Sequence, residues 1–300
     1  MSKLYLGTRE VTPAIVTGGS GGSYSEFPPY QVSNGVANRR SGTLTGNEFS
    51  NITTVGDYAL YYTFIQHTGL TGILDLSSLT TVGDHSLYYS FYGCTGLTSV
   101  DLSSLTTVGD YGLCYTFHSC TGLTSALDLS SLTTVGSNGF SNAFRDCTGL
   151  TSVDLSSLTT VEDWGLYYSF HSCTGLTSVD LSSLTTVGDR GLYYTFRDCT
   201  GLTSALDLSS LTTVGSNGFS NAFSGCTALE NIYFPALTTT SFGSYTNQFS
   251  NMLTNTGTTK THTLHFPSNL QSTISGLTGY PTFGGTSGYV TLAFDLPATS

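Results

Sequence analysis

The chain has 300 residues, a formal net charge of −11, only 9% charged residues and 38% hydrophobic residues. An acidic surface cannot displace the counterions of a phosphate backbone, so the composition excludes nucleic acid as a partner. No run approaches the roughly 18 consecutive apolar residues of a membrane-spanning helix, so we expect no membrane insertion.

The first segment, residues 1–17, is predicted to be an N-terminal attachment segment. It begins MSKLYLGTREVTPAIV and has no long apolar stretch after Lys3, so no secretory signal peptide is visible. Only Gly and Ser occur from Gly18 to Ser23, which is typical of a flexible linker. Residues 18–42 are therefore predicted to be this linker together with an N-terminal cap.

Residues 43–251 contain a repeat. The phrase DLSSLTTV recurs almost unchanged, with steps of 26 or 27 residues between successive aspartates. A leucine pattern with a period of 20–29 residues predicts a solenoid of leucine-rich repeats, in which each coil packs only on its neighbours. We therefore predict a β-rich leucine-rich-repeat solenoid with short parallel strands, short helical turns and loops.

Within one coil, apolar spacing predicts the local structure. Val100 and Leu102 are two residues apart, so on a strand they share the buried face. Leu113 and Phe117 are four residues apart, which favours one short helical turn. Two coils carry an extra residue in the phrase SALDL, at 125–129 and 204–208, which predicts a β-bulge.

The chain ends in a different pattern. Val290, Leu292, Phe294 and Leu296 alternate with more exposed residue types, which predicts a half-buried strand. A solenoid needs its last coil covered, so we interpret residues 252–300 as a C-terminal cap.

The cysteines fall almost entirely in one column of the repeat. No C-x-x-C spacing exists, so a zinc site is not indicated. Neighbours in the column would lie close enough for a disulfide by distance alone, but parallel side chains suit the bond poorly. We predict buried free thiols, and a more accessible position for Cys114, which replaces a repeated Tyr. The column is Cys94, Cys120, Cys147, Cys173, Cys199 and Cys226.

Carboxylates also form a column, and at about 5 Å spacing they repel each other by roughly 1 kcal/mol per pair. Two interpretations are open: each Asp accepts local hydrogen bonds in an Asx-type turn, or the column weakly holds hard cations such as Ca²⁺. A second acidic column is interrupted at Ser137 and Ser216, which argues against a continuous row of ions. The candidate metal column is Asp75, Asp101, Asp128, Asp154, Asp180 and Asp207.

Two positions per coil vary while the rest is copied, and tyrosines run beside them. No Ser-His-Asp set, paired catalytic carboxylates or phosphate loop is visible, so the sequence predicts a binding surface without enzyme activity or cofactor. Drift of exposed positions after duplication, or plain tyrosine packing between coils, are the alternatives. The candidate binding residues are Tyr88, Tyr89, Tyr92, Tyr111, His118, Arg145, Trp164, Tyr167, Tyr168, His171, Arg190, Tyr193, Tyr194 and Arg197.

The coils resemble the BspA-like leucine-rich repeats over about residues 43–275. Ala-Phe, two variable residues and Cys occur at 143–147 and 222–226, and the Phe-Pro turn occurs at 234–235 and 266–267. Most coils depart from this pattern by an inserted Leu-Tyr-Tyr. The resemblance implies the fold and leaves function open.

The two ends are similar to leucine-rich-repeat proteins of gut bacteriophages, through LYLGTREVTPAI and the tail from TLHFPSNL onward. This resemblance implies a virion fibre or tip module, located on a virion or extracellularly, that contacts a host cell-surface protein or glycan. Its N-terminal segment would bind other virion proteins. A bacterial cell-surface adhesin is the alternative, and a spacer or self-assembling filament subunit, with homo-oligomers, is another.

Removing one internal block should leave a shorter folded protein, because each coil contacts only its neighbours. Three coils make 79 residues, so deletion of residues 75–153 joins equivalent positions at Asp154. We expect the β-type circular dichroism spectrum to persist in this deletion variant. Loss of that spectrum would count against the solenoid.

Overall fold

The computed structural model describes residues 50–298, apart from 51, 59, 68, 244–245, 255, 257–259 and 286–288. Before them it describes only the backbone of five short strands, so most of the predicted attachment segment and linker lies outside the described residues. Two pairs of these strands are antiparallel hairpins: β1 (Leu4–Leu6) with β2 (Arg9–Val11), and β4 (Val32–Ser33) with β5 (Val36–Ala37). The fifth, β3 (Val16–Gly18), pairs antiparallel with β6 (Ile52–Val55).

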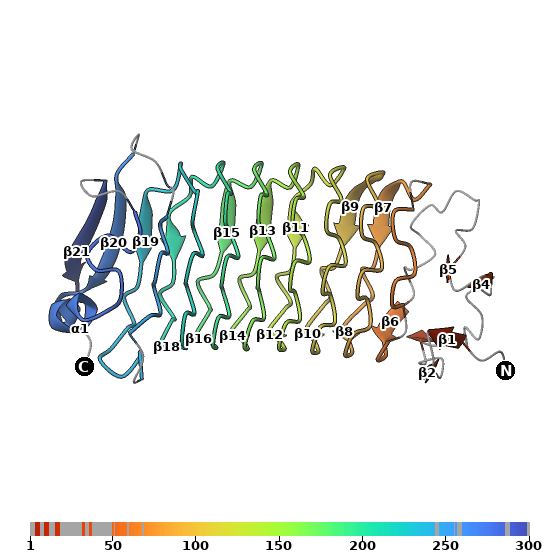
Figure 1. The fold of residues 1–300 in the computed structure, drawn as a ribbon, viewed down its shortest axis with the longest axis horizontal. Helices are drawn as coiled ribbons and strands as arrows, with labels where there is room; N and C mark the ends of the chain where they lie inside the picture. Colours follow the sequence, from red (N-terminus) through yellow and green to blue (C-terminus); the bar gives the residue numbers. More distant parts are fainter. Residues whose placement is uncertain are drawn as a thin grey trace.

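From β6 onward the chain winds into coils stacked along one axis (Figure 1). One ladder of short parallel strands, built from the Thr-Thr-Val phrase, runs without a break along the stack. Val is buried in each of its strands, so the ladder closes one side of the core. After β6 its members are β8 (Thr81–Val82), β10 (Thr107–Val108), β12 (Thr134–Val135), β14 (Thr160–Val161), β16 (Thr186–Val187) and β18 (Thr213–Val214).

A second parallel ladder carries the repeated Asp, and it is broken into three sheets. Its breaks fall before β11 and β17, where the SALDL coils add their extra residue, and the inserted Ala126 and Ala205 are exposed. The predicted bulge is therefore an interruption of the ladder. The sheets are β7 (Gly72–Asp75) with β9 (Leu97–Asp101); β11 (Leu127–Asp128), β13 (Ser152–Asp154) and β15 (Ser178–Asp180); and β17 (Leu206–Asp207), β19 (Asn231–Tyr233), β20 (His262–Pro267) and β21 (Val290–Leu296).

The core is a set of stacked columns of identical side chains, which confirms the predicted repeat solenoid. Phenylalanines make one of these columns, with successive ring centroids 5.1 to 5.7 Å apart and ring planes within 15° of parallel. Such offset stacking adds to the energy of burying the rings. The column is Phe64, Phe91, Phe117, Phe144, Phe170, Phe196 and Phe223.

The predicted short helical turns are wrong. Leu113 and Phe117 are buried as expected, but the backbone around them is a series of turns, in which Tyr111 and Tyr115 have φ of 55° and 57°. The N–H of Leu113 donates to Gly139 O of the next coil at 2.8 Å, where a helix would bond within its own segment. Among the described residues, the helices are η2 (Ser268–Leu270) and α1 (Gln271–Ser275), both in the predicted C-terminal cap.

The second acidic column joins coils together. Asp57 Oδ1 accepts the backbone N–H of Asp84 at 2.9 Å, and Asp84 Oδ1 accepts that of Asp110 at 2.9 Å. Asp110 Oδ1 does the same for the backbone N–H of Ser137, at 2.9 Å. Each carboxylate therefore faces an N–H donor of the next coil, which offsets the repulsion between neighbouring carboxylates.

The cysteines are free and buried, as predicted for the repeated column. Each column thiol donates to a Phe carbonyl of the preceding coil; Cys120 Sγ, for example, lies 3.1 Å from Phe91 O. The expectation that Cys114 is more accessible is wrong, because its side chain is only 3% exposed. Burial raises the pKa of the Cys114 thiol to about 12, so the reactive thiolate is suppressed there too.

We expect the native protein to be inert to a thiol reagent near neutral pH, because burial keeps the thiols protonated. After denaturation without reductant, all seven cysteines should react. The measurement is a colorimetric thiol count before and after denaturation. A count below about six after denaturation would mean that disulfides form between coils.

Candidate functional site

The segment between each Thr-Thr-Val strand and the following Cys carries the candidate binding residues, and we call its outer surface the turn face. Tyrosines stack along this face because equivalent residues repeat at the spacing of paired strands. Ring centroids of Tyr89 and Tyr115 are 4.4 Å apart, and those of Tyr168 and Tyr194 are 4.6 Å apart. One coil interrupts the stack, since Asn142 stands where its neighbours carry Tyr.

Trp164 is the centre of the aromatic group that follows the interruption at Asn142. Its ring meets Tyr167 edge-on at 5.0 Å and Tyr193 at 5.9 Å, and the Arg190 guanidinium lies 4.7 Å from its centroid. The structure thus brings together four of the candidate binding residues that the sequence predicted. Trp164 and Arg190 are half-buried, and each therefore still presents part of its side chain to solvent.

These large side chains stand on an unusual backbone. Trp164 has φ of 59°, and Arg190 has φ of 55°, in the left-handed region that bulky residues rarely adopt. Asn138 and Asn217 occupy the same position in other coils, and Asn tolerates this region well. Bulky residues here cost of order 1 kcal/mol each, and such strain is often associated with function.

A row of Asp, His and Arg side chains runs beside the tyrosines. Asp146 lies between two histidines of neighbouring coils, 3.8 Å from His118 Nε2 and 3.9 Å from His171 Nδ1. His171 also approaches Asp198, with 3.6 Å between Nε2 and Oδ2. Arg145 and Arg197 pair with the Asp that follows each of them, at 3.6 and 3.3 Å.

His118 and His171, the two histidines of this row, are less accessible to solvent than the sequence suggested. His118 is only 9% exposed, which corrects its assignment to the binding surface, and His171 is half-buried. Burial is the main reason why the pKa of each lies below the ordinary 6.5, although Asp146 opposes the shift. Arg145 and Arg197 also face His171 and lower its pKa.

The Asp column on the second ladder forms the predicted Asx-type turns. Asp75 Oδ1 accepts the backbone N–H of Ser77 at 3.1 Å and its hydroxyl at 2.6 Å. The other five aspartates accept the N–H of the second residue on in the same way. The described residues contain no group of three or more His, Cys, Asp or Glu side chains arranged to hold a metal ion.

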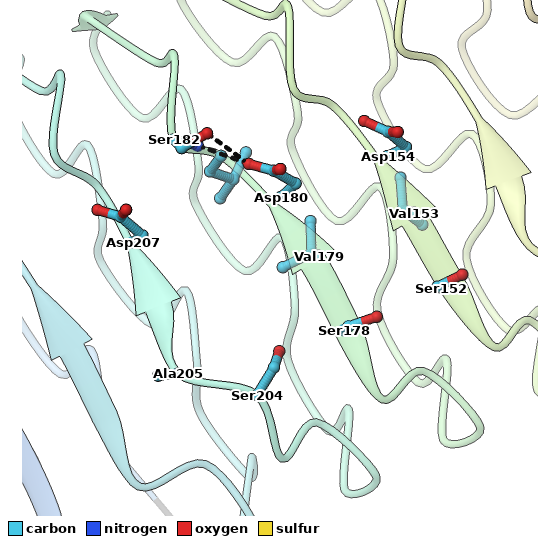
Figure 2. A pocket seen from close by; sticks show the side chains of 11 residues that line it. Ser152, Val153, Asp154, Ser178, Val179, Asp180, Ser182, Ser204, Ala205 and Asp207 are labelled. Atoms are coloured by element: carbon cyan, nitrogen blue, oxygen red, sulfur yellow. Dashed lines mark hydrogen bonds between the residues drawn. The ribbon is translucent and has the colours of Figure 1, made fainter.

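A hollow of about 510 Å³ lies over β13, β15 and β17, at the second break in the ladder. Figure 2 shows Asp154, Asp180 and Asp207 along it, with Ser204 at the point where the extra residue enters. Ser204 Oγ is buried without a hydrogen-bond partner. The sequence analysis missed this hollow, although the inserted residue of SALDL marks its position.

The fold is that of a leucine-rich-repeat solenoid, because the coils stack, each coil adds a strand to two parallel ladders, and Leu and Phe fill the core. The family model described as BspA type leucine rich repeat region matches in six copies, over residues 43–142, 87–222 and 115–253. The chain belongs to this family. No curated protein matches the sequence at a significant level.

Solved structures to which the chain is similar include three bacterial proteins. A leucine-rich-repeat protein of T. pallidum is 23% identical, with 51% of this chain and 73% of that chain covered and a TM-score of 0.30. One from Bacteroides ovatus is 15% identical, covering 81% and 88%, with a TM-score of 0.22. A leucine rich cell surface protein of Faecalibacterium prausnitzii is 13% identical, covering 81% and 83%, with a TM-score of 0.30.

These identities and TM-scores are low, so family membership rests on the repeat motif. Within the part of the chain that the structure describes, no helix has the length and hydrophobicity needed to cross a membrane.

Acidification should destabilise the fold through His118 and His171. Since the folded-state pKa of each lies below 6.5, the unfolded chain binds more protons in the window between the two values. Stability is therefore lost as pH falls below about 6.5. Thermal melts from about pH 7.5 to about pH 5.5 should show a smaller decrease in Tm for the double variant His118→Gln, His171→Gln than for the natural chain. An equal decrease in Tm for the natural chain and the double variant would exclude these histidines as the cause of the acid destabilisation.

Proposed function

We propose that the chain is a non-enzymatic attachment protein that binds a host cell-surface protein or glycan through the turn face. The main support for this proposal is the cluster of Trp164, Arg190 and Tyr193, in which the Arg guanidinium lies over the Trp ring. Trp, Tyr and Arg are the side chains that dominate binding energy at interfaces. Stacking between coils already fixes these side chains, so little conformational entropy is lost when a partner binds.

The backbone supports this proposal too. The N–H of Trp164 donates to Asp189 O at 3.0 Å, and the N–H of Arg190 donates to Ser216 O at 2.8 Å. These bonds to the next coil hold a conformation that Asn would adopt at lower cost. Trp and Arg stand at a position where other coils use Asn. Their presence therefore favours selection for binding over random drift after duplication as the explanation.

We further propose that the protein serves a phage virion, as a fibre or tip module whose first 17 residues attach to other virion proteins. This finer proposal rests on the resemblance of the two chain ends, of which the first lies mostly outside the described residues. A bacterial cell-surface adhesin of the same family is the alternative, and it would use the same turn face. A spacer or filament subunit would leave that face without a role.

Replacing Trp164 and Arg190 by Asn should weaken attachment while keeping the fold, because Asn is the residue that other coils use at this position. Loss of two central anchors is expected to cost about 2 kcal/mol or more, roughly a 30-fold weaker affinity. The measurement is binding of labelled protein to cells of candidate gut bacterial hosts and to a glycan array, with a thermal melt to check folding.

Two control variants separate binding from stability. Asn217→Ala changes the same column at the same left-handed backbone but removes no ring, so attachment should be retained. Leu155→Ala removes a fully buried core side chain and should lower the free energy of unfolding by about 2–5 kcal/mol. Unchanged attachment by the folded Asn double variant would favour the spacer.

A further inference from the structure

The strand β21 stands at the end of the stack (Figure 1) and is paired on one side only. With seven residues it is the longest strand of the described chain, and β20 is its single strand partner there. The opposite end of the stack differs, because β3 covers β6 in antiparallel pairing. The two ends of the solenoid are therefore unequal: β21 is an edge of seven residues, whereas β7, the edge of the same ladder at the other end, has four.

Apolar side chains of β21 are left half-covered at this edge. One layer further in, Leu264 and Phe266 of β20 are 0% exposed. Val290, Leu292 and Phe294 of β21 pack against the same core but remain only partly buried. Burying the rest of these three side chains would stabilise any complex formed there, at roughly 25 cal/mol per Å².

The backbone of β21 also has unpaired groups, and their position can be derived. The N–H of His262 donates to Tyr289 O at 2.8 Å, so Tyr289 faces β20. In a parallel ladder alternate residues face one neighbour, so Thr291 also faces β20, while Val290 and Leu292 direct their N–H and C=O groups to the open side. The same register holds through Ala293.

Devices that usually protect an edge strand are missing from β21. Natural edges carry Lys, Pro or inward-pointing charges, whereas the sequence here is VTLAFDL. Its single charge, Asp295, is held by His265 of β20, with Nδ1 3.0 Å from each carboxylate oxygen. A long, mostly apolar edge of this kind is a template for pairing with another strand.

We propose that this edge binds the same edge of a second copy, with β21 pairing antiparallel to β21 about a two-fold axis through Leu292. That register pairs the backbone groups of Leu292 with those of its symmetry mate, and it sets Val290 opposite Phe294. Asp295 falls opposite Tyr289, so no like charges meet in a molecule of net charge −11.

The self-complementarity of the strand favours a second copy over an unrelated partner. A two-fold contact uses the same patch on both copies and closes at two chains. At the other end of the solenoid β3 covers β6, and the edge left in the ladder of β21 is the shorter strand β7, which pairs only with β9.

The first test is the mass of the full chain in solution, measured by sedimentation equilibrium. We expect two chains for the natural protein. Leu292→Glu places two carboxylates opposite each other and should raise the dissociation constant at least about tenfold. The control Thr291→Glu changes an exposed residue of the same strand that lies opposite Ala293, so it should remain dimeric. A natural chain that is monomeric at all concentrations overturns the proposal, as does an unchanged Leu292→Glu dimer.

A second test keeps the proposal falsifiable if Leu292→Glu fails to fold. Leu292 and its symmetry mate form a hydrogen-bonded pair in this register, with Cα atoms about 5.5 Å apart, within the range of a disulfide. Leu292→Cys should therefore give a covalent dimer on mild oxidation, while Asp295→Cys, opposite Tyr289, should not. The native cysteines are buried and give no background. Equal crosslinking of both variants, or none of Leu292→Cys, would contradict the two-fold register.

Discussion

The whole structure depends on backbone hydrogen bonds that join each coil to the next in register. They occur in the two ladders and also in the turns, where the N–H of Tyr115 reaches Ser141 O at 2.8 Å. Because every coil is held at the same spacing, identical residues meet at close contact along the axis. The Phe, Cys, Tyr and Thr columns all follow from this constraint, and Thr106 Oγ1, for example, donates to Thr80 O of the previous coil at 2.9 Å.

The same constraint limits what the repeat can contain. A charged residue copied into every coil would lie next to the same charge in the neighbouring coils. The carboxylates that are copied therefore need N–H donors close by. Asp75 takes them from its own turn, while Asp84 takes one from the next coil. A chain with only 9% charged residues fits this requirement. Extra charges are placed where columns vary, as in the pair of Asp146 with Arg145.

Periodicity predicted the fold, the core columns and the free thiols, because burial repeats with the coil. It did not predict the turn backbone, since apolar residues four apart, such as Leu113 and Phe117, fit a helical turn and a turn series equally well. Only the hydrogen bonds to the next coil decide between them. Cys114 and His118 were misjudged for a related reason, because their burial depends on side chains that adjacent coils supply.

Left-handed backbone in the turns also determines how this surface can vary. Positive φ recurs at three positions of the coil, and those positions hold Asn, Asp, Gly, Ser, Gln, His, Tyr, Trp or Arg. Val, Ile, Thr and Pro do not occur there in the repeated coils, which agrees with the poor fit of β-branched residues to this conformation. A designed library on this scaffold would therefore diversify these columns with unbranched, aromatic and amide side chains and keep the intervening inter-coil bonds.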